Sequence, residues 1–249
     1  MRHAGSAPRS DRPTIVLVHG AGHTAEVWRA VQAGLDHPSV AVDLPGRRDR
    51  VASIAEVTIE EAATSVAADV ADATTGPLVL VGHSAGGVVL PGVAARLPDR
   101  VDHLVFVAGL CARDGERVVT DVRPDAADQM AARLEQARVE LRGAMLDPDP
   151  AIAGVTAITV DVAMPIDSLN YMSQVVSWRG VREGTGRTFV RCLRDRIQPR
   201  ALQAKLIENC GATAVVDLDS GHTPAVSVPV ELARILDRVA DELVTTAPA

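Results

Sequence analysis

Residues 78–90, LVLVGHSAGGVVL, place a serine at the bend between two apolar runs, and no other stretch constrains the fold as tightly. The five residues before His83 favour a buried strand, and the residues after Ser84 favour a buried helix. Gly82 and Gly86 have no Cβ, so the backbone can turn sharply and the helix can pack close to the strand. The stretch is either a glycine turn that happens to contain a serine or a turn built to present that serine.

The remainder of the chain repeats this change from strand to helix. Short apolar runs predict strands at 14–18, 39–42, 78–82, 101–108, 188–193 and 212–216. Helical patterns fall at 25–35, 58–75, 85–97, 199–209 and 229–244, with Thr58 as an N-cap before Glu60 and Glu61. Strands that alternate with helices indicate an α/β fold, with a mainly parallel sheet covered by helices on both faces. Ligands bind such sheets beyond the carboxyl ends of the strands.

The alternation divides the chain into a core and an insertion. Residues 1–12 are small, polar and basic, which predicts a flexible tail. Residues 13–109 and 187–249 carry the alternating pattern and form the predicted core. Residues 110–186 contain helical segments, loops and prolines, with a further strand conceivable only at 155–160, so we expect a helical lid above the sheet.

Composition excludes several kinds of protein. A hydrophobic content of 47% and a charged content of 23% over 249 residues are typical of a folded globular chain. The net charge of −7 argues against a nucleic-acid partner. The sequence has no apolar run of membrane-spanning length, and its first dozen residues lack the apolar core of a signal peptide, so a cytoplasmic location without membrane contact is expected. Cys111, Cys192 and Cys210 have no CxxC spacing and are expected to be small core residues.

Three polar residues follow predicted strands. Ser84, Asp195 and His222 each come after a strand, so they can converge at one edge of the sheet. A serine hydroxyl is a weak nucleophile that needs a base, and histidine with a carboxylate behind it supplies one. Asp114 is an alternative acid after the strand at 101–108. Asp217 and Asp219 are further rivals near His222 in sequence, although close neighbours on one loop rarely point correctly.

With these residues the chain resembles the α/β-hydrolases, and within them the small-lid group of plant methyl-ester esterases, plant hydroxynitrile lyases and bacterial esterases. The matching segments are VLVHGAGHTAEVW (16–28), VDLPG (42–46), LVGHSAGG (80–87), RDRIQPRALQ (194–203) and LDSGHTP (218–224). The resemblance covers nearly all of 13–244 and is weakest in the lid.

The resemblance implies a role for each residue of the site. Ser84 would be the nucleophile, His222 the base and Asp195 the acid that orients it. The backbone N–H groups of Ala21 and Ala85 would form the oxyanion hole. Of the neighbouring histidines, His19 is expected to be structural and His83 to pack or bond beneath the turn.

Substrate contacts are expected on both sides of the turn. Gly20 would let the backbone pass close to the substrate, and His23 would line the pocket. Tyr171 and Trp178, together with the methionines of the lid, suit an apolar pocket. Asp167 in the lid either caps a helix or meets a polar group of the substrate.

The predicted function is hydrolysis of a small, largely apolar carboxylic ester through an acyl-enzyme, acting on a small-molecule substrate. No cofactor or metal is expected, since neither metal-ligand spacing nor a phosphate-binding loop occurs. Cleavage of a thioester, a lactone or a C–C bond remains an alternative, as does a non-catalytic ligand sensor. Hydroxynitrile lyases resembled here carry Thr and Lys where this chain has Gly20 and Thr223, which disfavours that activity. A homodimer is left open.

Overall fold

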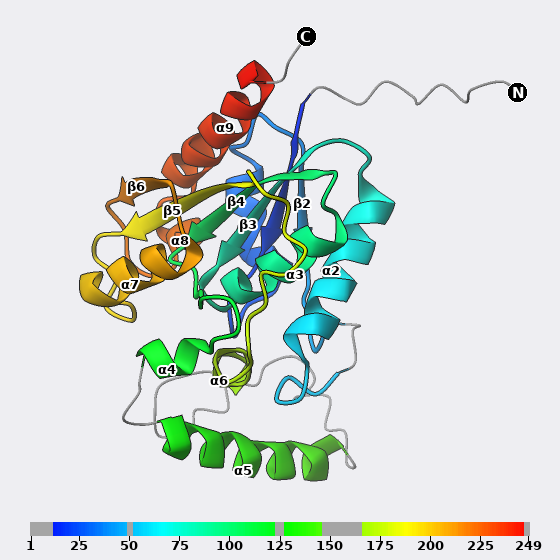
Figure 1. Ribbon diagram of the computed structural model, residues 1–249, viewed down its shortest axis with the longest axis vertical. Coiled ribbons are helices and arrows are strands. Elements are labelled where there is room, and N and C mark those ends of the chain that lie inside the picture. The colour runs from blue at the N-terminus through cyan, green and yellow to red at the C-terminus, as the bar shows by residue number, and fades with distance from the viewer. Residues whose placement is uncertain (1–11, 49–51, 123–126, 146–165, 247–249) are drawn as a thin grey trace, which may run out of the picture.

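The computed structural model describes residues 12–48, 52–122, 127–145 and 166–246, and it contains one parallel sheet of six strands. The strands are β1 (Thr14–Val18), β2 (Ser39–Val42), β3 (Leu78–His83), β4 (Val101–Val107), β5 (Gly186–Cys192) and β6 (Ala214–Leu218). Their order in the sheet is β2-β1-β3-β4-β5-β6, and every neighbouring pair is parallel (Figure 1). The predicted α/β fold class and all six core strands are confirmed, with boundaries that differ by no more than two residues.

Alternate residues of each strand point into two different cores. Ile15 and Leu17 of β1 pack with α1 (Arg29–Gln32), α8 (Pro224–Ser227) and α9 (Pro229–Thr246). Val16 and Val18 pack in the opposite core, against α2 (Ile59–Ala73), α3 (Leu90–Arg96) and α7 (Arg200–Cys210). Because both faces are covered, the central strands are apolar throughout rather than alternating.

The first turn of α2 follows its sequence signals. The Glu61 N–H donates to Thr58 Oγ1 at 3.0 Å, and the Thr58 N–H donates to Glu61 Oε2 at 2.8 Å. This reciprocal arrangement is a capping box, which satisfies backbone donors that the helix itself leaves unpaired. The predicted N-cap at Thr58 is therefore confirmed.

Two predicted helices differ from the observed ones. The expected helix at 25–35 is a 3-10 turn, η1 (Ala25–Trp28), followed by the short α1, which ends before Gly34, a residue with poor helix propensity. The expected helix at 85–97 begins as the 3-10 helix η2 (Ser84–Val89) and becomes α-helical only at Leu90. At Gly87 an added Cβ would lie 2.5 Å from the Leu110 carbonyl oxygen, so this segment is confined by the chain beside it.

Three helices of the 110–186 segment lie together at the end of the sheet away from both termini (Figure 1). They are α4 (Val118–Val122), α5 (Ala127–Met145) and α6 (Ile166–Met172). Buried side chains of these helices join the same core as Ala85. The strand considered at 155–160 lies outside the described residues, as do residues 1–11 of the predicted tail at 1–12.

The strand order brings the residues after β1 next to those after β3. From β1 the chain crosses to β2 on one side and later returns to β3 on the other, so β1 and β3 are neighbours at the point where the strand order reverses. In open α/β sheets such a switch point opens a crevice for ligands at the carboxyl ends of the strands. Gly82 of β3 pairs with Val18 of β1, which places Ser84 beside the loop that starts at His19.

None of the helices in the described part of the chain combines the length and apolarity needed to cross a bilayer. Within those same ranges no cluster of His, Cys, Asp or Glu is arranged to hold a metal ion. Cys111, Cys192 and Cys210 are buried free thiols, in agreement with their expected place in the core.

Candidate active site

Ser84 occupies a strained turn between β3 and η2. Its φ angle is +48°, in the left-handed region that non-glycine residues rarely adopt. Gly86 lies against β1, where an added Cβ would come within 2.6 Å of the His19 carbonyl oxygen, so no side chain fits there. A serine in a tight turn between a strand and a helix has the geometry of a nucleophile elbow.

His222 connects the serine to a carboxylate. Its Nε2 atom lies 2.9 Å from Ser84 Oγ, and its Nδ1 atom lies 2.7 Å from Asp195 Oδ2. A carboxylate only accepts hydrogen bonds, so Nδ1 carries the proton and Nε2 is left to accept the serine hydroxyl proton. The structure thus brings together three residues that the sequence separates by 138 and 27 positions.

Asp195 is held rigidly by its own loop after β5. Its Oδ1 atom accepts the N–H groups of Ile197 at 2.8 Å and Gln198 at 2.9 Å, and its side chain is fully buried. Burial alone would raise the pKa of this carboxyl, but the hydrogen bonds from His222 and the two backbone N–H groups outweigh it, and the pKa is lowered. Asp195 is therefore a carboxylate aligned to orient the imidazole.

The alternative acids are engaged elsewhere. Asp114 Oδ1 accepts the Trp178 backbone N–H at 2.7 Å. Asp217 pairs with Arg191 at 2.7 Å, and Asp219 pairs with Arg194 at 2.8 Å. Of the candidates considered from the sequence, only Asp195 contacts His222 among the described hydrogen bonds.

His19 fixes the direction of the Gly20–Ala21 peptide. The Leu44 N–H donates to His19 Nε2 at 3.1 Å, so His19 Nδ1 bears the proton and donates to the Gly20 carbonyl oxygen at 2.8 Å. In a trans peptide the N–H points opposite to the C=O, so the Ala21 N–H points away from His19. Burial lowers the pKa of His19 to about 4, which keeps it neutral and in this tautomer at neutral pH.

Ala85 is the residue expected to supply the second backbone donor. It is buried in the first turn of η2, where N–H groups have no partner within the helix. The loop after β1 comes close to the same turn, because an added Cβ at Gly20 would lie 3.0 Å from Ser84 Cβ. The two donors expected for an oxyanion hole thus belong to neighbouring segments of the switch point.

His83 has a specific contact that the sequence did not reveal. Its Nε2–H donates to the His222 main-chain oxygen at 2.8 Å, and an added Cβ at Gly20 would lie 2.8 Å from its Nδ1. Burial, reinforced by the nearby His222, lowers the pKa of His83 to about 3. The sequence predicted only that this residue packs or bonds beneath the turn, because its partner lies 139 positions away.

Of the residues expected to contact substrate, Gly20 and His23 lie beside His83, whereas Tyr171 and Trp178 have contacts elsewhere. His23 packs beside His83 with a ring-centroid separation of 5.9 Å, and burial lowers its pKa. Tyr171 is buried in the core. The Trp178 indole N–H donates to the Ala112 carbonyl oxygen at 2.9 Å, and the Arg187 guanidinium lies 4.3 Å above its ring. Among the described hydrogen bonds none joins Tyr171 or Trp178 to Ser84 or His222, so their contact with substrate stays a prediction.

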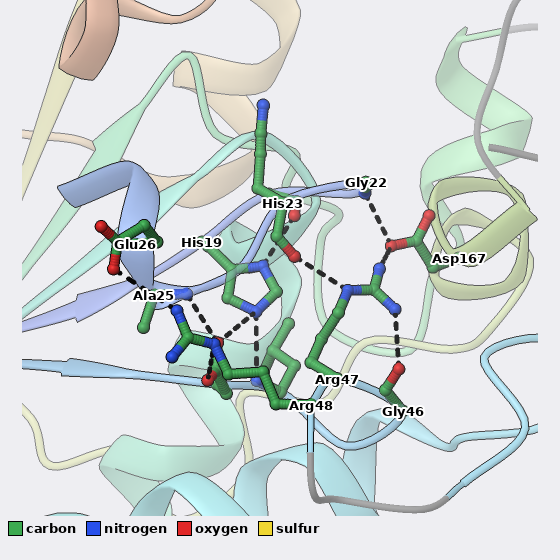
Figure 2. A network of polar contacts seen from close by, with 12 residues as sticks. His19, Gly22, His23, Ala25, Glu26, Gly46, Arg47, Arg48 and Asp167 are labelled. Atoms are coloured by element: carbon green, nitrogen blue, oxygen red, sulfur yellow. Dashed lines mark hydrogen bonds and ion pairs between the residues drawn. The ribbon is translucent and has the colours of Figure 1, made fainter. Parts of the chain in front are cut away.

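A second network, absent from the sequence expectations, surrounds the loop after β1 (Figure 2). Arg47, after β2, forms an ion pair with Asp167 of α6. Asp167 Oδ2 also accepts the Gly22 N–H at 2.9 Å, and Arg47 Nε donates to the His23 carbonyl oxygen at 2.8 Å. Asp167, expected to cap a helix or to meet a polar group of the substrate, forms an ion pair with a cation 120 positions away that no motif marks.

Comparison with known proteins shows similarity to hydrolases along most of the chain. The sequence model of a protein family described as "Alpha/beta hydrolase family" matches residues 15–235. Lipase LipV of Mycobacterium tuberculosis is 31% identical, over 89% of this chain and 91% of the lipase. Putative methylesterase 14 of Arabidopsis thaliana is 27% identical, over 90% of this chain and 71% of the plant protein. The crystal structure of a pyrethroid hydrolase from Sphingobium faniae superposes with a TM-score of 0.68 at 24% identity, covering 92% of this chain and 97% of the other.

Proposed function

The chain belongs to the alpha/beta hydrolase family, and from this premise we propose that it is a serine esterase with Ser84 as nucleophile, His222 as base and Asp195 as orienting acid. That the protein is a hydrolase follows from the family, whose lipase and methylesterase relatives align with most of its length. The proposal adds the residues, the acyl-enzyme and the kind of ester. The observation that carries it is the bridge that His222 makes between Ser84 and Asp195.

In the first half of the reaction Ser84 Oγ attacks the ester carbonyl carbon, and His222 Nε2 takes the hydroxyl proton. The carbonyl π electrons move to the oxygen, whose negative charge faces the Ala21 and Ala85 N–H groups. Asp195 stabilises the imidazolium without taking its proton. When the tetrahedral intermediate collapses, the C–O bond breaks and His222 returns the proton to the departing alcohol.

In the second half water replaces the alcohol. His222 Nε2 removes a proton from the water as it attacks the acyl carbon, and the second tetrahedral intermediate uses the same two N–H groups. Its collapse releases the carboxylic acid and returns the proton to Ser84 Oγ. The cycle balances with an ester and water as the only reactants.

A small, largely apolar acyl or alcohol group suits the surroundings of Ser84. In α4 and α6 the apolar side chains Val118, Val119, Leu169, Tyr171 and Met172 share a core with Ala85, and α6 also buries the polar residues Asp167, Ser168 and Asn170. Apolar walls with a few fixed polar groups are typical of sites for small molecules. Two relatives are named as a lipase and a methylesterase, and both names denote enzymes that cleave esters, which supports an ester as the substrate.

The test compares the wild-type protein with Ser84→Ala on p-nitrophenyl esters of two to twelve carbons. We expect hydrolysis by the wild type to be fastest at the short end and Ser84→Ala to lose about a thousandfold or more in kcat. A fluorophosphonate probe should label the wild type and leave Ser84→Ala unlabelled. Full turnover by the alanine variant would refute the proposal, and a preference for thioesters or lactones over matched esters would refute the substrate class.

A further inference from the structure

The ion pair between Arg47 and Asp167 is buried at the contact between α6 and the loop after β1 (Figure 2). The side chains are only 13% and 7% exposed. Because removing charges from water is costly, a pair buried in this way must be compensated by further hydrogen bonds. The partners of those hydrogen bonds indicate which part of the protein the ion pair holds in place.

The described hydrogen bonds of both charged groups lead to the protein backbone. Asp167 Oδ2 accepts the Gly22 N–H at 2.9 Å, and Oδ1 accepts the Ser168 N–H at 3.0 Å. Arg47 Nε donates to the His23 carbonyl oxygen at 2.8 Å, and a terminal nitrogen donates to the Gly46 carbonyl oxygen at 3.3 Å. The pair is thus engaged with the loop rather than directed at a substrate.

These bonds act on the peptide groups next to the proposed oxyanion donor. The Gly22 N–H belongs to the Ala21–Gly22 peptide, and the Gly20 carbonyl, held by His19, belongs to the Gly20–Ala21 peptide. Since each peptide group is planar, fixing one of its polar atoms fixes the direction of the other. Asp167 and His19 therefore hold the two peptide groups on either side of Ala21.

The loop needs such support because its own sequence does not define its shape. Gly20 and Gly22 flank Ala21, and Gly22 has a φ of +70°. Glycine populates positive and negative φ with similar ease, so this loop has more accessible conformations than an ordinary one. A backbone N–H is useful to an oxyanion only when it is already aimed at it.

We propose that Arg47 and Asp167 are positioning residues for the reaction, through which α6 holds the Ala21 N–H toward the oxyanion that forms at Ser84. The inference rests on the proposed function, since it assigns a task within that site. Neither side chain touches the reacting atoms; both act through the backbone of residues 22 and 23.

The test replaces the whole pair, so that no lone charge is left buried. Arg47→Met/Asp167→Leu removes both charges, and such replacements of buried pairs often preserve folding. We expect a melting temperature near that of the wild type, a kcat lower by about 10- to 100-fold because the donor is misaligned, and a KM within about twofold of the wild-type value.

A transition-state analogue separates positioning from general packing. Ser84 adds to a trifluoromethyl ketone, its proton passes to His222, and the former carbonyl oxygen becomes an oxyanion in the hole. We expect affinity for the ketone to fall by the same factor as kcat/KM, while affinity for the product acid changes little. Arg47→Met/Asp167→Asn should recover part of kcat, because the amide oxygen can still accept the Gly22 N–H.

The Arg182–Asp102 pair serves as a control. It also joins the 110–186 segment to the core, at 2.7 Å, but it is more exposed, at 45% and 31%, and lies at the start of β4 rather than its carboxyl end. Arg182→Met/Asp102→Leu should keep the wild-type kcat. A folded Arg47→Met/Asp167→Leu protein with wild-type kcat, or with a raised KM and unchanged kcat, would overturn the inference. Should that protein not fold, wild-type kcat in Arg47→Met/Asp167→Asn would overturn it equally, because the His23 carbonyl would have lost its donor without effect.

The proposed function is tested separately in the same series. Full turnover by Ser84→Ala would refute the proposed active site. If Ser84→Ala is inactive while the variant without the Arg47–Asp167 pair is fully active, the proposed esterase function stands. Only the positioning role of Arg47 and Asp167 is then refuted.

Discussion

The Nε2 atom of His83 lies 2.8 Å from the main-chain oxygen of His222, so the residue before the serine holds the loop that carries the base. The same imidazole fills the space next to Gly20 on the other side of the turn. His83 therefore sets the spacing between the loops that supply the base and the oxyanion donor. Both must stay within hydrogen-bond reach of Ser84 for the proposed reaction.

Replacing His83 with phenylalanine should lower kcat by about fivefold to tenfold and change KM little. An aromatic ring, somewhat larger than imidazole, is kept, but the hydrogen bond to His222 is lost, and a bond of this kind contributes about 1 kcal/mol. Steady-state hydrolysis of p-nitrophenyl acetate measures the effect. His103→Phe is the control, since His103 bonds Thr188 on the neighbouring strand at 2.9 Å, and an equal loss in both variants would contradict the prediction.

Ser84→Gly should melt about 2 °C above Ser84→Ala, although both lack the nucleophile. At a φ of +48° alanine keeps the strain of a left-handed residue, whereas glycine adopts this angle without it. The relief of about 1–2 kcal/mol exceeds the extra chain entropy that glycine gives to the unfolded state, about 0.5–1 kcal/mol. Differential scanning calorimetry decides the order, and a lower melting temperature for the glycine variant would mean that the turn is not strained.

Gly20→Ala should lower kcat by about 100-fold. The new Cβ would lie 2.8 Å from His83 Nδ1 and 3.0 Å from Ser84 Cβ, so the loop after β1 must move away from the serine. A displacement of about 1 Å in a catalytic group costs roughly this factor. Gly221→Ala provides the comparison, because nothing lies within 4 Å of its added Cβ and it should fold with unchanged stability. Wild-type kcat for Gly20→Ala would show that the loop is not confined there.

The free energy of unfolding should fall as the pH is lowered from about 6.5 toward 4. Burial lowers the pKa of His19 to about 4 and that of His83 to about 3, while both return to about 6.5 in the unfolded chain. Over that interval the unfolded state binds more protons than the native state, so acid favours unfolding by up to about 1.4 kcal/mol per pH unit for each histidine. Urea titrations at pH 7, 6 and 5 measure this slope.

The same titrations on His83→Phe provide the internal check. Removing His83 should reduce the proton uptake on unfolding by about one. A slope that is unchanged by this substitution would show that His83 is already protonated in the native state.

The sequence alone determined the local features of this protein and the order in which they occur. The apolar run before Gly82, the small residues after Ser84 and the capping signals around Thr58 act over a few positions, so each specified its turn or helix independently of the rest. From the alternation of strands and helices it followed that the residues after the strands would share one edge of a parallel sheet.

Only the tertiary structure decided which of those residues meet. Asp195 rather than Asp114 faces His222, because the loop after β5 turns its carboxylate inward while Asp114 accepts the Trp178 backbone N–H. Arg47 and Asp167 find each other across 120 positions, and no periodicity or motif reports such a pair. Contacts of this kind depend on how the strands are ordered and how α6 packs against the loop after β1, and a pattern that extends over a few residues carries no record of either.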